Sequence, residues 1–133
     1  GAELEEPIQE SPPEALLQIA IHNATEGCIF ETWAALIAAH QALHSPHPEL
    51  RKIYGRVAQD EVRHGQLAWD IHSWMMSQLS EEEQELVLVK QASALHRLRD
   101  IAAMESNVRF LGRPTKDEAE ILVEAFISGV QAA

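Results

Sequence analysis

The chain has 133 residues, 46% of them hydrophobic, so it is long enough to bury one hydrophobic core. Its formal net charge of −11 and its pI near 4.9 argue against nucleic acid or an anionic membrane as the main partner. A single cysteine, Cys28, excludes an intramolecular disulfide framework and a cysteine-based zinc site. Because no apolar run has membrane-spanning length and no signal peptide is recognisable, we expect a cytoplasmic protein without a membrane partner.

The N-terminal half predicts a flexible arm followed by two long helices. Residues 1–13 are acidic and rich in proline, which is typical of a loose arm. From residue 14 the apolar residues recur at helical spacing, so residues 14–133 are predicted to form a single all-α domain. The first helix is expected to run to about residue 43, where the prolines of HSPHP (44–48) end it. The second is expected from about Pro48 to about Leu79.

Two shorter helices are predicted in residues 80–133. Ser80 and Glu83 have the spacing of a capping box, so the third helix should begin near residue 81 and end near residue 105. A connector at residues 106–114 follows. Thr115 and Glu118 form a second capping box, which predicts a fourth helix ending near Gly129.

The second long helix carries two polar residues on an apolar stripe. In steps of three and four, the stripe contains Leu50, Ile53, Val57, Glu61, His64, Ala68, Ile71 and Met75. Such a stripe is expected to be buried, and a buried carboxylate without a partner costs several kcal/mol. A metal ion would be a suitable partner, since iron, manganese and zinc all accept carboxylate and imidazole ligands. Glu61 and His64 are therefore candidate metal ligands, one helical turn apart.

The first long helix offers two further candidate ligands, Glu26 and Glu31. Antiparallel pairing about a turn at residues 45–46 would place Glu26 level with His64 and Glu31 level with Glu61. In an α-helix, residues five apart point about 140° from each other, so the two glutamates would face different directions. Glu26 interrupts a bulky apolar stripe, whereas Glu31 lies among small residues. Either or both can be ligands.

This pattern resembles the ferritin-like di-iron carboxylate proteins, whose site uses a Glu from each of two helices and a Glu-x-x-His from each of two others. Residues 23–33 (NATEGCIFETW) and 60–69 (DEVRHGQLAW) carry the resemblance, which covers residues 14–79. The chain holds one half of this ligand set. His96 is the only histidine in residues 80–133, and it is not part of a Glu-x-x-His because residue 93 is a serine. A two-fold homodimer would supply the other half, since a C₂ interface repeats the same patch on both subunits. The half-length ferritin-like proteins packaged in encapsulin shells resemble this arrangement.

The resemblance implies a helical hairpin that becomes a four-helix bundle by homodimerisation, alone or in a larger assembly of dimers. It implies two iron ions per dimer, bridged by carboxylates, and ferroxidase or oxidase activity with dioxygen. It also implies that Asp60 hydrogen-bonds His64 of the opposite subunit. One alternative is a helical dimerisation or binding module with a structural or vestigial metal site, and another is a dimanganese or zinc centre.

Four other residues have simpler expected roles. Cys28 is expected to be a small core residue. His40, His44 and His47 cluster near the turn between the two long helices, where exposed histidines usually bind nothing.

Overall fold

The structure, a computed structural model, describes residues 13–104 and 111–132, and these residues form helices and no strand. The elements are α1 (Pro13–His22), η2 (Asn23–Glu31), α2 (Thr32–His44), α3 (Pro48–Gln78), α4 (Glu81–Ala103) and α5 (Lys116–Ala132). The predicted all-α class is confirmed. Of the predicted arm and connector, residues 1–12 and 105–110 lie outside the described residues.

Helix starts follow the capping signals of the sequence. The side chain of Ser80 accepts a hydrogen bond from the Glu83 N–H at 3.2 Å, and Glu83 accepts one from the Ser80 N–H at 3.0 Å. Thr115 and Glu118 make the same reciprocal pair at 3.2 and 3.0 Å. Both predicted capping boxes are therefore confirmed, and each satisfies two backbone donors at a helix N-terminus.

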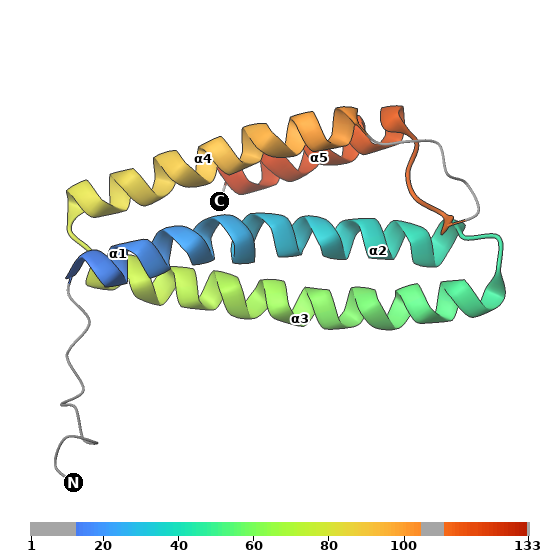
Figure 1. The fold of residues 1–133 in the computed structure, drawn as a ribbon, viewed down its shortest axis with the longest axis horizontal. Coiled ribbons are helices and arrows are strands. Elements are labelled where there is room, and N and C mark those ends of the chain that lie inside the picture. Colours follow the sequence, from blue (N-terminus) through green and yellow to red (C-terminus); the bar gives the residue numbers. More distant parts are fainter. Residues whose placement is uncertain (1–12, 105–110, 133) are drawn as a thin grey trace, which may run out of the picture.

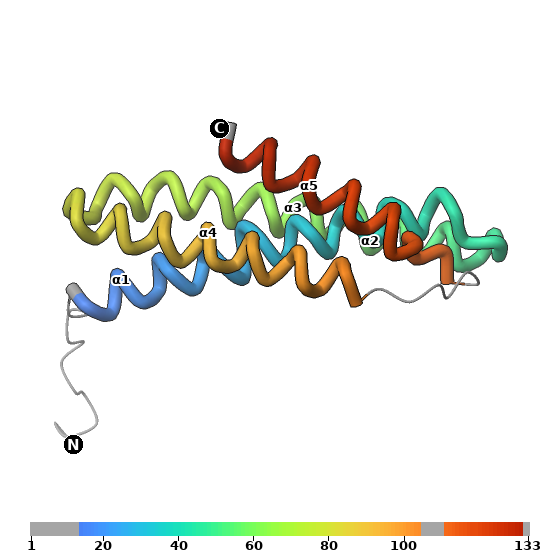
Figure 2. The backbone as a smooth tube through the Cα atoms, turned by 90° about the horizontal axis from the view of Figure 1, so that it is seen from above, coloured from blue at the N-terminus to red at the C-terminus, as the bar shows by residue number. Residues whose placement is uncertain are grey.

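α1, η2 and α2 follow one another without a break and form one long rod that lies between α3 and the α4–α5 pair (Figure 1). Seen from above, α5 crosses the rod at an angle (Figure 2). The main core combines apolar side chains of the rod with those of α4 and α5: Cys28, Ile29, Trp33 and Ile37 with Leu95, Leu98, Val123 and Ile127. Burial raises the pKa of the Cys28 thiol to about 12, which confirms this residue as part of the core.

The middle of the rod, η2, is a π-helix rather than an α-helix. In a π-helix, backbone hydrogen bonds join residues five apart, so such residues lie nearly one above the other. The angle of about 140° expected between Glu26 and Glu31 assumed an α-helix, and it does not apply to this segment.

Side chains fasten η2 to both of its neighbours. Asn23 donates to the backbone carbonyl of Ala68 on α3 at 2.9 Å. On the other side, the buried amide of Gln91 on α4 donates to the carbonyl of Ala24 at 3.1 Å. The π-helical segment is thus held from two sides by specific hydrogen bonds.

α3 is covered on one face only. Ala68 and Met75 of the predicted stripe are buried, but Ile53 is 51% exposed and Val57 42% exposed. The expectation that the whole stripe is buried is wrong, because the rod packs against one side of α3 and no described residue covers the other. None of the helices in the described part of the chain has the length and apolar character needed to cross a membrane.

Candidate metal centre

Glu31, Glu61 and His64 come together at the junction of η2 and α3. Each offers one ligand atom, and these atoms all lie within 4.8 Å of one another. His64 Nδ1 and Glu61 Oε1 are 3.8 Å apart. Two ligands of one ion, each bound at about 2.0–2.2 Å, can be no more than about 4.4 Å apart. The Glu61–His64 pair already satisfies this limit, and small side-chain rotations would bring in Glu31.

The pairing of the two long helices selects Glu31 for this group. The sequence-based register would place Gly27 against His64, but Gly27 packs against Ala68, where a Cβ on the glycine would stand 2.9 Å from the Ala68 Cβ. The same register would pair Thr32 with Gln59, but Thr32 lies against Gly65, six residues further along α3. The expected register is therefore wrong. Figure 1 gives the reason, since α3 begins beyond the end of α2 at the turn.

Glu26 lies in the same groove as the three clustered residues but outside the cluster itself. Glu26, Glu31 and His64 line a groove of about 570 Å³ between the rod and α3, together with His22 and several apolar side chains. The π-helical backbone explains how residues 26 and 31 reach one groove. The structure therefore brings Glu31, Glu61 and His64 together and places Glu26 beside them.

The predicted ligands are accessible. The side chain of His64 is 59% exposed and that of Glu61 is 26% exposed. This half-open position contrasts with the buried site that the sequence pattern suggested. It leaves the ligand atoms open to a metal ion and to a second protein surface.

Asp60 is exposed and forms an ion pair with Arg63 on the same turn of α3. Within one chain, Asp60 therefore serves a local pair on the outer face of the helix. Its predicted hydrogen bond to His64 of another subunit stays a prediction.

Two residues behind the ligands, Thr32 and Gly65, were not singled out from the sequence. The Trp69 indole N–H donates to the Thr32 hydroxyl at 3.3 Å, across the interface of α2 and α3. Gly65 packs against the same hydroxyl. The glycine directly after His64 could have indicated this close approach, because glycine has no Cβ to keep two helices apart.

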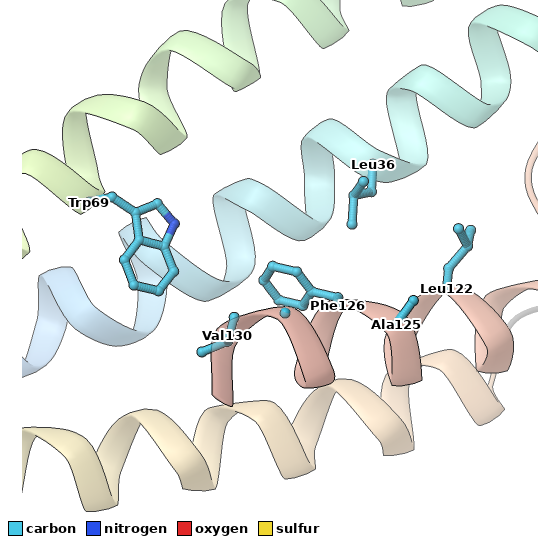
Figure 3. Close-up of a pocket in the computed structure, with 7 residues that line it drawn as sticks. Leu36, Trp69, Leu122, Ala125, Phe126 and Val130 are labelled. Atoms are coloured by element: carbon cyan, nitrogen blue, oxygen red, sulfur yellow. The ribbon is translucent and has the colours of Figure 1, made fainter. Parts of the chain in front are cut away.

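An apolar groove of about 480 Å³ adjoins the site on the α5 side. Leu36, Trp69 and residues of α5, including Phe126 and Val130, point into it, and no charged side chain lines it (Figure 3). Leu36 and Trp69 also line a smaller cavity of about 260 Å³ that reaches Glu61. Of the candidate ligands, Glu61 is thus next to a largely apolar cavity between α2 and α3.

Comparison with known proteins adds no family assignment: the chain matches no family model, no curated protein and no solved structure.

Proposed function

We propose that this chain is one half of a ferritin-like di-metal protein, in which two copies meet through the outer face of α3. One observation carries the proposal: Glu31 of η2 and Glu61 and His64 of α3 offer ligand atoms within 4.8 Å of one another, and His64 is exposed on the face of α3 that the described chain leaves uncovered. The resemblance in residues 23–33 and 60–69 supports the same assignment.

The outer face of α3 has the pattern of a helix–helix contact. We call it the α3 seam; it consists of Ile53, Val57, Asp60, His64, Leu67, Ile71 and Trp74. These positions alternate in steps of four and three, as in a coiled-coil seam. Leu67 is 58% exposed and Trp74 is 59% exposed, although both are large and apolar. The exposed apolar residues lie on both sides of the polar pair Asp60 and His64, and exposed apolar residues aligned on one helix face favour a protein partner.

With a two-fold axis near His64, the α3 seam of one copy would pack against the α3 seam of a second copy. The interface would then bring two copies of the Glu31–Glu61–His64 group toward each other. Four carboxylates and two imidazoles form the donor set of a di-metal carboxylate centre. Glu26, which lines the same groove, would be available as a further carboxylate of each copy.

The donor set fits iron, with manganese or zinc as the alternatives. When bound as a bridged ferrous pair, iron would supply the electrons that reduce dioxygen, which is ferroxidase or oxidase chemistry. The protein's own residues would hold the ions: the carboxylates neutralise the charge, and His64 supplies a nitrogen ligand. The apolar groove beside Trp69 would limit water on the inner side.

The second candidate function is a helical dimerisation module with a structural or vestigial metal site. The exposed seam alone favours it, because a coiled-coil-like contact forms without metal. The two candidates differ in metal content and not in assembly.

Sizing and metal analysis of the same purified sample test the proposal. We expect a dimer, or an assembly of dimers, with about two iron ions per dimer and rapid oxygen consumption on ferrous addition. His64→Ala and Glu61→Gln should abolish iron loading, while Glu49→Gln, an exposed glutamate elsewhere on α3, should not. A metal-free dimer would instead support the dimerisation module.

A seam variant tests whether the site needs two copies. Leu67→Glu should give a monomer that no longer loads iron, because a charge at the centre of the seam opposes its own copy. Leu88→Glu is the matched control, since Leu88 is also exposed (49%) but lies on α4. A monomeric Leu67→Glu protein with a full metal complement would refute the half-site proposal.

A further inference from the structure

A second group of metal-binding side chains lies at the far end of α2, away from the candidate centre. His40 and His44 are on the last turns of α2, and Glu118 is on the first turn of α5. Together with Gly112, Arg113 and Thr115 they line a cavity of about 230 Å³. The two histidines belong to the cluster near the turn between α2 and α3, and they have no part in the proposed function.

The hydrogen bonds of the two histidines define their tautomers. His40 Nδ1 lies 2.9 Å from the carbonyl oxygen of Gly112, and His44 Nδ1 lies 2.9 Å from that of His40. A carbonyl oxygen only accepts, so both Nδ1 atoms must carry the proton. In the neutral rings, both Nε2 atoms therefore have a free lone pair. A histidine that donates from one nitrogen to a backbone carbonyl is oriented to bind metal through the other.

His40 and Glu118 are already separated as two ligands of one ion would be. His40 Nε2 is 3.5 Å from Glu118 Oε2. A tetrahedral ion with bonds of about 2.1 Å would place its ligands about 3.4 Å apart. Since the neutral Nε2 and the carboxylate oxygen both present lone pairs, a cation between them is needed for a favourable contact. That cation is either a proton on His40 or a metal ion.

His40 is largely covered, and the backbone at Gly112 fixes the orientation of its ring. The His40 side chain is only 13% exposed. Gly112 has a positive φ of 70°, and a Cβ there would stand 2.4 Å from the backbone nitrogen of Ser45. Only glycine can therefore bring this carbonyl so close to the end of α2, which is where it orients the His40 ring.

Glu118 is prepared as an anionic ligand. Its Oε1 accepts the N–H of Thr115 in the capping box, which leaves Oε2 directed at His40. The hydrogen bonds from Thr115, and then the contact with His40, lower the pKa of the Glu118 carboxyl below its usual value. The group is thus ionised at neutral pH.

We propose that His40, His44 and Glu118 form a second metal site, for a divalent ion that prefers imidazole, zinc or copper. His40 and Glu118 are in place. The His44 ring is stacked on His40 with centroids 4.0 Å apart, so it would have to turn to add its Nε2, and water would complete the coordination. Because the ligands come from α2 and α5, the bound ion fastens the start of α5 to the end of α2.

Zinc binding to the full chain tests this site separately from the proposed di-metal centre. The measurement is made in a His64→Ala background, which removes a ligand of the first centre. We expect one zinc ion per chain to remain, measured by calorimetry, and zinc to raise the thermal midpoint. Adding His44→Ala, at an exposed residue, should weaken zinc binding by more than about tenfold.

Two further variants complete the test. Glu118→Gln keeps the oxygen that caps α5 and removes the charge, so it should also weaken zinc binding by more than about tenfold. His96→Ala, an exposed histidine on α4, is the control and should not change it. The proposal is overturned if zinc leaves the thermal midpoint of the His64→Ala protein unchanged, which would mean that only a proton lies between His40 and Glu118. Equal zinc affinity with and without His44 would also overturn it.

Discussion

A Cβ at position 65 would stand 3.1 Å from the hydroxyl oxygen of Thr32, so α2 and α3 make a close approach at Gly65. The two residues are chain neighbours of candidate ligands, since Thr32 follows Glu31 and Gly65 follows His64. The spacing between the helices at this point therefore determines whether Glu31 reaches the other two ligands.

Gly65→Val should reduce metal loading without removing any ligand. The added side chain would push α2 from α3 and break the contact between Thr32 and Trp69. Overpacking of this kind costs about 1–3 kcal/mol of unfolding free energy. Metal content and thermal unfolding of the variant measure the two effects.

Gly55→Val is the matched control, because a Cβ at position 55 on the same helix meets nothing within 4 Å. The control carries the same cost of a β-branched residue in a helix. If both variants lose metal equally, then the approach of the helices at Gly65 has no part in assembling the site.

Gln91→Leu should destabilise the π-helical segment. The Gln91 amide is buried and donates to the Ala24 carbonyl, so leucine would leave that carbonyl without this donor in the interior. We expect a loss of about 1–3 kcal/mol in urea unfolding. We also expect faster hydrogen exchange of the η2 amides. Unchanged η2 exchange would show that Gln91 does not hold this segment.

The sequence predicted the helices well because their end signals are local. The capping boxes at Ser80 and Thr115 involve residues three apart, and both are visible in the sequence and confirmed in the structure. The π-helix at residues 23–31 has no comparable signal. Its side chains instead make long-range hydrogen bonds, such as that from Asn23 to Ala68, 45 residues away.

The sequence predicted which residues are candidate ligands, but it did not predict which of them lie together. Periodicity identified Glu61 and His64, and the hairpin supplied Glu26 and Glu31 as alternatives. The choice between these two depended on how far α3 extends beyond α2, which no residue pattern encodes. The exposure of the α3 seam could not be predicted from the sequence either, because an apolar stripe has the same spacing whether it packs against its own chain or against another.

The thiol of Cys28 should be unreactive in the folded protein. Burial raises its pKa to about 12, so at pH 8 almost none of it is the nucleophilic thiolate. A thiol reagent at pH 8 should label the native chain slowly and the urea-unfolded chain at once. Rapid native labelling would mean that η2 opens readily at Cys28.

Mild acid should destabilise the protein partly through His72. Burial lowers the pKa of this imidazole below its usual 6.5, and the ring packs edge-on against Trp69, with centroids 5.7 Å apart. The unfolded chain therefore binds a proton more tightly than the folded one does, and protonation favours unfolding. The stability that neutral His72 contributes is complete above about pH 6.5 and is lost as the pH falls toward its lower folded pKa.

His72→Gln should therefore show a smaller drop in thermal midpoint than the parent chain when the pH is lowered from about 7 to about 5, a range that includes the usual pKa of histidine. His96→Gln, at an exposed histidine, should keep the parent's drop. The assignment to His72 fails if the two variants respond to pH alike.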